Sequence, residues 1–261
     1  MATKALVILS GGQDSTTCLF WAKQSFDEVH AITFDYGQRH RIEIDAAKKV
    51  AELAQIASHE IVEVRDCLIS ASPLTSDNEL EKYDSFEQMD SEIGSRRELT
   101  FVPMRNALFL TIAANRAEAL GIPNLVTGVC AMDNANYDDC REVFIDAARD
   151  YMNTALGHDH RGTKPITIHT PLMYLTKAET VRLSFRLPGC WQALAYSHTS
   201  YDGKYPPVDM NHANVLRAQG FLEAGLPDPL VLRAFDEGVM NLPATNNYSV
   251  DALEIGGLHV R

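Results

Sequence analysis

Residues 4–22 read KALVILSGGQDSTTCLFWA. The apolar run at 4–9 has the length and composition of a buried parallel strand. The hexamer SGGQDS follows at once, and apolar residues then recur at helical spacing from Thr16 to Lys23. The stretch therefore predicts a strand, a tight glycine-rich turn and a helix in direct succession.

The turn between that strand and that helix has the composition of an anion-binding site. Gly11 and Gly12 let the backbone approach a ligand closely, and the N–H groups of the first helical turn favour an anion. Ser10 and Ser15 can add hydroxyl donors, and Asp14 can cap the helix. The turn lacks the lysine of the Walker loop. A loop that grips pyrophosphate without this lysine suits cleavage of ATP between its α- and β-phosphates.

The composition favours a cytoplasmic globular protein with a small-molecule substrate. The chain of 261 residues is 46% hydrophobic and 22% charged, which is ordinary for a soluble protein. Because the sequence shows neither a signal peptide nor a long apolar run, we predict neither secretion nor a membrane partner. Five scattered cysteines indicate reduced thiols. The net charge of -12 argues against a nucleic-acid partner.

Strand and helix patterns alternate through the first part of the chain. Strands are predicted at 29–34, 59–64, 124–128 and 165–169, and helices at 41–57, 107–120 and 142–156. This alternation predicts a Rossmann-like α/β domain over residues 1–186, with a parallel five-stranded sheet flanked by helices. Residues 66–98 are rich in acids and are predicted to form a solvated, mobile excursion rather than a lid. Residues 187–261 are predicted to form a small helical region.

Six ordered blocks lie between Lys4 and Pro229. They read SGGQDSTTCL, FDYGQRH, FVPMRN, TGV followed by D-x-x-x-Y-x-D-C-R, PL-x-x-x-TKAE, and LRAQGFLEAGLPDP. In this order and spacing the chain resembles the QueC family of 7-cyano-7-deazaguanine synthases, which belongs to the PP-loop ATP-pyrophosphatase superfamily. The resemblance implies an adenine nucleotide alpha hydrolase-like fold, a cytoplasmic homodimer and the use of ATP with Mg²⁺. The implied reaction converts 7-carboxy-7-deazaguanine and ammonia to 7-cyano-7-deazaguanine, through an adenylated carboxylate, on the route to queuosine.

The resemblance also assigns site residues. The implied ATP-binding residues are Ser10, Gly11, Gly12, Asp14, Ser15, Asp35 and Gly128; the implied substrate-binding residues are Tyr36, Gln38, Arg39, His40, Asp133, Tyr137, Asp139 and Arg141; and the implied catalytic residues are Asp14, Arg105 and Lys177. Asp14 is also implied to organise Mg²⁺.

A structural role stays open for several of these residues. Asp35 could close a turn, and His40 could lie on the surface. Arg105 could pair with an acid of the excursion, and Lys177 could sit in an exposed first helical turn. Cys140 is predicted to be a small buried residue rather than a nucleophile, since adenylation needs no thiol.

The chain departs from the family near its C-terminus, where the family carries a zinc site patterned T-C-Y and then C-G-x-C-x-x-C. Ser200, Val208, Asn211 and Asn214 stand at the four cysteine positions. Valine cannot bind zinc, and Ser and Asn are poor structural zinc ligands. We therefore predict that zinc is absent and that aromatic and proline side chains hold this segment by packing.

Two further departures leave the acceptor of the acyl group open. Met104 replaces a small residue in FVPMRN, and residues 133–139 differ from the family's usual Ser-Gly-Tyr-Pro-Asp. The first hypothesis is nitrile formation from ammonia. The second is a QueC-like ligase that adenylates a deazaguanine acid and transfers it to another amine. The third, a non-catalytic nucleotide-binding protein, is disfavoured by the intact SGGQDS.

Overall fold

A computed structural model describes residues 2–38, 41–76, 78–132 and 136–249. Five strands form one parallel sheet: β1 (Lys4–Ile8), β2 (Glu28–Asp35), β3 (Ser58–Glu63), β4 (Asn124–Val126) and β5 (Thr167–His169). Their order is β3-β2-β1-β4-β5, which confirms the predicted Rossmann-like α/β class. The strand order reverses beside β1, and open α/β sheets bind ligands at such a point, beyond the carboxyl ends of the strands.

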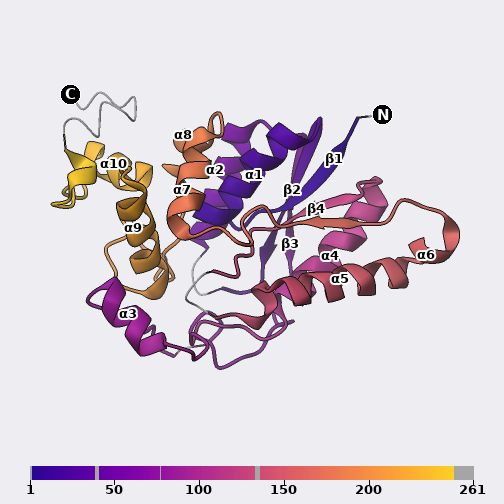
Figure 1. Cartoon of the computed structure of the whole chain (residues 1–261), viewed down its shortest axis with the longest axis horizontal. Helices are drawn as coiled ribbons and strands as arrows, with labels where there is room; N and C mark the ends of the chain where they lie inside the picture. The colour runs from indigo at the N-terminus through magenta and orange to yellow at the C-terminus, as the bar shows by residue number, and fades with distance from the viewer. Residues whose placement is uncertain (1, 39–40, 77, 133–135, 250–261) are drawn as a thin grey trace.

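Helices cover both faces of the sheet (Figure 1). The helices that pack around the sheet are α1 (Gln13–Ser25), α2 (Ile42–Ala54), α4 (Arg105–Leu120), α5 (Glu142–Leu156) and the pair α7 (Lys177–Arg186) and α8 (Cys190–Leu194). The remaining elements are α3 (Phe86–Ile93), α6 (His158–Arg161), α9 (His212–Ala224), α10 (Pro229–Asp236) and the short 3-10 turns at Asp138–Cys140 and Asn246–Tyr248. None of the helices in the described part of the chain is long and apolar enough to cross a membrane.

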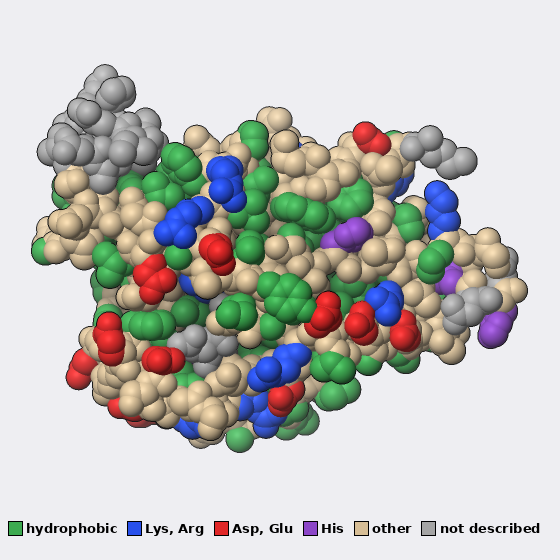
Figure 2. Space-filling view, in the orientation of Figure 1, with side chains coloured by type: hydrophobic (Ala, Val, Ile, Leu, Met, Phe, Trp, Pro, Cys, Tyr) green, Lys and Arg blue, Asp and Glu red, His purple; other side chains and the backbone are tan. Residues whose placement is uncertain are grey.

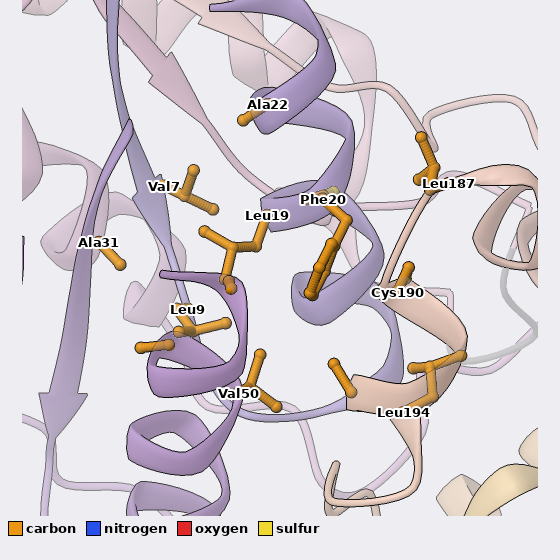
Figure 3. Packing of buried hydrophobic residues seen from close by; sticks show 14 of the residues in the cluster. Val7, Leu9, Leu19, Phe20, Ala22, Ala31, Val50, Leu187, Cys190 and Leu194 are labelled. Carbon is orange, nitrogen blue, oxygen red and sulfur yellow. The ribbon is translucent and has the colours of Figure 1, made fainter. Parts of the chain in front are cut away.

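The side chains of β1 divide the core into two layers, as the alternation of a strand requires. Val7 and Leu9 pack with α1, α2 and α8, and Figure 3 shows Leu19 of α1 lying between them and Phe20 turned toward α8. Leu6 faces the opposite layer, which α4 and α5 cover. The apolar run in the first strand is therefore continuous because both faces of the sheet are buried.

The segment 66–98, predicted to be solvated throughout, is exposed in some parts and buried in others. Tyr83, Met89 and Ile93 are almost fully buried and form a third core with Val215 and Leu216 of α9. Met89 and Ile93 lie four residues apart on one face of α3, so an apolar stripe runs through an acidic segment. The prediction of a solvated excursion is wrong for this part, because the high acid content concealed the stripe.

A capping box marks the start of α7. The Glu179 backbone N–H donates to Thr176 Oγ1 at 3.2 Å, and the Thr176 backbone N–H donates to Glu179 Oε2 at 2.8 Å. The helix therefore begins at Lys177, one of the predicted site residues.

Candidate active site

A cavity of about 280 Å³ opens at the carboxyl ends of β1, β2 and β4. Its walls bring together segments far apart in sequence, which is how α/β folds build small-molecule sites. The predicted site residues that line it are Ser10, Gly12, Asp14, Ser15, Tyr36, Gln38, Arg105, Gly128, Tyr137, Arg141 and Lys177.

The loop at 10–15 is held by its own serines. Ser10 Oγ and Ser15 Oγ lie 2.9 Å apart, and the Ser10 N–H donates to Ser15 Oγ at 3.2 Å. Gly11 has φ +89°, and a Cβ there would come within 2.4 Å of the carbonyl oxygen of Glu43. A Cβ on Gly128 would come within 3.2 Å of the Ser15 nitrogen. Both glycines therefore permit close backbone packing behind the loop.

The N-terminus of α1 points its first N–H groups toward this cavity. Gly12 is the N-cap, and within the described ranges no side chain caps the helix. Asp14 instead lies in the first turn, so the prediction that it caps the helix is wrong. A helix start without a capping side chain favours an anionic ligand through its N–H groups and its dipole.

Lys177 is directed at the loop. Its Nζ lies 2.9 Å from Asp14 Oδ2, and the Lys177 side chain is only 11% exposed. A Cβ on Gly220 of α9 would come within 2.4 Å of Lys177 Cγ, so this glycine leaves space for the lysine stem. The alternative that Lys177 occupies an exposed helical turn is wrong. The loop thus gains from α7 the ammonium group that its own sequence lacks.

Arg105 stands at the start of α4 among tyrosines. Its guanidinium carbon lies 5.9 Å from the centre of the Tyr36 ring. Among the described residues it forms no ion pair with an acid of the excursion, contrary to one open alternative. Burial raises the pKa of Tyr36 to about 12, although Arg105 opposes the rise. Tyr36 therefore keeps its proton and can donate a hydrogen bond.

Tyr137 is fixed by the end of the excursion. The buried Glu98 accepts a hydrogen bond from the Thr100 N–H at 2.5 Å, and the Tyr137 hydroxyl lies 3.5 Å from the same carboxylate oxygen. Arg97 lies over the Phe101 ring at 4.0 Å, and that ring contacts Tyr137. The acidic segment therefore orients a predicted substrate-binding residue.

Two predicted acids do not line the cavity. Asp35 accepts from Arg65 at 2.6 Å and from the Gly37 N–H at 3.3 Å, and the hydrogen bond from Arg65 lowers the pKa of Asp35. Asp139 accepts from the Asn106 N–H at 3.4 Å, and burial raises the pKa of its carboxyl group. Asp35 thus closes the loop after β2, and Asp139 braces the start of α4.

Of the remaining predicted residues, Gln38 is described by the structure and three others are not. Gln38 accepts from the Tyr36 N–H at 3.0 Å and so shapes the loop as well as lining the cavity. Arg39, His40 and Asp133 lie outside the described residues.

The positions that match the family's zinc cysteines hold hydrogen-bonded side chains. Ser200 Oγ accepts from Asn211 Nδ2 at 3.1 Å and from Asn214 Nδ2 at 2.8 Å, and donates to Asp202 at 2.5 Å. Val208, the second of the four positions, forms no such hydrogen bond with its apolar side chain and is 62% exposed. Within the described ranges no group of three or more His, Cys, Asp or Glu is placed to hold a metal. The set of Ser, Asn and Val offers zinc no thiolate or imidazole.

Several cavity residues were not predicted as functional, and Glu43, Tyr201 and His212 are among them. Glu43 carried a detectable signal, since it lies in the first turn of the helix that follows β2 at the same sheet edge. His212 is 4% exposed, neither ring nitrogen has a hydrogen-bond partner among the described residues, and burial lowers its pKa to about 4. His212 lines the same cavity as Glu43 and Tyr201 because of tertiary contacts, which no local sequence pattern encodes.

Comparison with known proteins gives a consistent result. The family model described as "Queuosine biosynthesis protein QueC" matches residues 4–225. The chain is 49% identical over 230 residues to the 7-cyano-7-deazaguanine synthase of Gloeobacter violaceus, covering 87% of this chain and 95% of the relative. It is 46% identical to that of Laribacter hongkongensis and 47% identical to that of Chromobacterium violaceum, in each case covering 88% of this chain and 94% of the relative.

Proposed function

The chain belongs to the QueC family, and from this membership we propose that it is the synthase that converts 7-carboxy-7-deazaguanine and ammonia to 7-cyano-7-deazaguanine with ATP. The reaction forms a C–N bond, so the enzyme is a ligase, and it serves queuosine biosynthesis. The observation that carries the proposal is the meeting of the loop at 10–15, Lys177 and Arg105 in one cavity. The names of the relatives give no support to the alternative ligase with another amine acceptor.

The chemistry requires two activations of the same carbon. The substrate carboxylate attacks the α-phosphorus of ATP, its oxygen becomes bonded to AMP, and pyrophosphate leaves. Ammonia then forms a C–N bond as the C–O bond to AMP breaks, which gives an amide. A second adenylation, on the amide oxygen, allows loss of AMP and a proton to give the nitrile. Arg105 and Lys177 supply positive charge for the substrates and for the pyrophosphate that leaves.

The loop residues suit the triphosphate. The N–H groups at the start of α1 and the hydroxyls of Ser10 and Ser15 would contact phosphate oxygens. Asp14 is the carboxylate that could help to hold Mg²⁺, which commonly binds one or two carboxylates together with substrate phosphates. When bound, Mg²⁺ neutralises phosphate charge. Lys177 lies 2.9 Å from Asp14 and would exchange this contact for one with a phosphate held at the loop.

The chain's side chains also bear on zinc, on the oligomeric state and on nucleic-acid binding. We propose that the enzyme works without zinc, since the hydrogen bonds of Ser200, Asn211 and Asn214 occupy the side chains that would otherwise face a metal. A cytoplasmic homodimer that binds no nucleic acid fits the family and the charge. On the face in Figure 2, Lys and Arg side chains are interspersed with Asp and Glu and form no continuous basic track.

Product analysis tests the proposal. The purified protein is incubated with the acid, ATP, Mg²⁺ and an ammonium salt, and mass spectrometry follows the amide, the nitrile and the nucleotide products. We expect the amide to appear first and the nitrile after it, with one AMP and one pyrophosphate released for each of the two steps. Formation of ADP and phosphate, or adenylation of the acid without amide or nitrile, contradicts it. Lysine or other amines offered in place of ammonium test the alternative ligase.

A further inference from the structure

Glu43 is an acid of the cavity wall with no function assigned so far. It is the second residue of α2 and is half-buried. Its carbonyl oxygen packs against Gly11, which anchors the residue beside the loop at 10–15. Glu43 lines the same cavity as Arg105 and Tyr201. Its carboxylate therefore belongs to the space in which the substrates would react.

The other acids near the cavity are engaged by the protein. Asp14 pairs with Lys177, Asp35 with Arg65, and Glu98 accepts hydrogen bonds from Thr100. Within the described ranges Glu43 accepts no hydrogen bond and forms no ion pair within 4 Å. A carboxylate that is held at a cavity wall without a protein partner is available to a ligand or to a proton.

The surroundings of Glu43 favour proton exchange near neutral pH. The ionisable groups that face it are Arg105 at the start of α4, Tyr36 beyond β2 and Tyr201 in the C-terminal region. Burial raises the pKa of Glu43 to about 7, and Arg105 limits the rise. Both tyrosines keep their protons, because burial raises their pKa values as well. Among these groups only Glu43 titrates in the neutral range.

We propose that Glu43 is the general base that deprotonates the nitrogen nucleophile, an assignment that rests on the proposed function. At neutral pH ammonia is mostly present as ammonium, which has no lone pair to attack with. One N–H proton passes to the Glu43 carboxylate, and the nitrogen lone pair forms the C–N bond. The C–O bond to AMP then breaks, its electron pair leaves with AMP, and the second proton that the nitrogen must lose to become a neutral amide passes to water.

The same group serves the second half of the reaction. After the proton on Glu43 returns to water, the carboxylate accepts an N–H proton from the adenylated amide. The nitrogen electron pair completes the C≡N bond, and the C–O bond to AMP breaks again. One base with a pKa close to the working pH thus acts in both nitrogen steps, where general base catalysis contributes about 10²–10⁴-fold.

The test separates adenylation from nitrogen transfer with the full-length variant Glu43→Gln, and Glu52→Gln on the exposed end of the same helix is the matched control. Adenylation is measured as acid-dependent exchange of pyrophosphate into ATP. Nitrogen transfer is measured with ammonium and, separately, with hydroxylamine, a weaker base that is unprotonated at neutral pH.

We expect Glu43→Gln to keep pyrophosphate exchange within about twofold and to lose about 100-fold in amide formation from ammonium at neutral pH. Because the fraction of free ammonia rises with pH for both proteins, the readout is the ratio of the wild-type rate to the variant rate, which should rise with pH up to about 7 and stay constant above it. Hydroxylamine should give hydroxamate at nearly the wild-type rate.

Parallel losses in exchange and amide formation, or equal losses with ammonium and hydroxylamine, would overturn the assignment of Glu43 while leaving the proposed function intact. A wild-type enzyme that forms the adenylate but neither amide nor nitrile would overturn both.

Discussion

Two polar regions meet at the cavity and use their hydrogen-bonding groups in opposite ways. The loop at 10–15 presents helix N–H groups, and one ion pair from Asp14 to Lys177, to the cavity, while its serine hydroxyls hold the loop through a hydrogen bond to each other. The C-terminal region, residues 197–228, bonds its polar side chains to one another. Arg217 donates to Asp228 at 2.6 Å and to Ser197 at 2.9 Å, and Ser200 joins the two asparagines. The first arrangement suits ligand binding, and the second suits holding a wall in place.

This difference predicts which substitutions remove activity and which remove stability. The ion pair of Lys177 and Asp14 faces the open cavity and keeps 11% and 27% of its side-chain surface exposed, so its loss should cost less folding free energy than the loss of a fully buried pair. A buried charge that is paired within the protein cannot be removed without leaving its partner unsatisfied.

Lys177→Met gives the largest expected effect, on activity. The methionine keeps the apolar stem packed near Gly220 but removes the charge, so we expect pyrophosphate exchange to fall about 1,000-fold. The free energy of unfolding should change by less than about 1 kcal/mol, as for partly exposed ion pairs. Lys48→Met, on the exposed face of α2, is the control. Pyrophosphate exchange within tenfold of the wild-type rate would contradict a role for the Lys177 charge in adenylation.

Arg217→Met should act on stability instead. Arg217 and Asp228 are 3% and 5% exposed, and loss of the guanidinium leaves a buried carboxylate without its ion pair. We expect the free energy of unfolding to fall by about 3–5 kcal/mol in urea denaturation. Arg149→Met removes a surface pair and should cost less than about 1 kcal/mol. Equal losses of unfolding free energy in the two variants would contradict the view that the buried Arg217–Asp228 pair stabilises the C-terminal region.

Ser200→Ala tests whether hydrogen bonds, rather than zinc, hold the segment. The Asn211 and Asn214 amides lose the hydroxyl acceptor of Ser200, although Asn214 keeps its bond to the Asp209 carbonyl oxygen, so we expect a loss of about 1–3 kcal/mol in unfolding free energy. Prolonged chelation of the wild-type protein should leave its melting temperature unchanged. Stoichiometric zinc in the purified protein, with a lower melting temperature after chelation, would contradict the zinc-free account.

Glu43→Gln has the smallest expected effect on stability, and that effect depends on pH. Burial raises the folded-state pKa of Glu43 from 4.5 to about 7, so the unfolded state binds fewer protons between these values. Wild-type stability therefore includes a contribution that is complete below pH 4.5 and is lost as the pH rises through 7. The melting temperature of the variant minus that of wild type should increase over this window and stay constant above it. A difference that is independent of pH would contradict a buried, titrating carboxylate.

Local patterns predicted the parts of the molecule that depend on neighbouring residues. The apolar run before SGGQDS predicted β1, and the Thr176–Glu179 capping box fixed the helix start that carries Lys177. The apolar stripe of α3 was missed because acids dominate that segment, although Met89 and Ile93 have helical spacing.

Tertiary contacts decided the rest. Asp35 and Asp139 lie in loops that were predicted to bind ligands, but buried carboxylates need partners, and these acids use Arg65 and Asn106. No sequence pattern identifies such partners, since they are distant in the chain. Tyr201 reaches the cavity through packing of the C-terminal region, which no local pattern encodes, whereas the position of Glu43 in the first turn of α2 was a local signal that was missed.

In the proposed reaction, the cavity brings the α-phosphorus of ATP to the substrate carboxylate. The most direct measurement uses 7-carboxy-7-deazaguanine labelled with a heavy oxygen isotope in its carboxylate, with mass spectrometry of the nucleotide released. The account predicts that one labelled oxygen appears in the phosphate of AMP for each amide formed. Labelled oxygen in inorganic phosphate, or AMP free of label while amide accumulates, would contradict it.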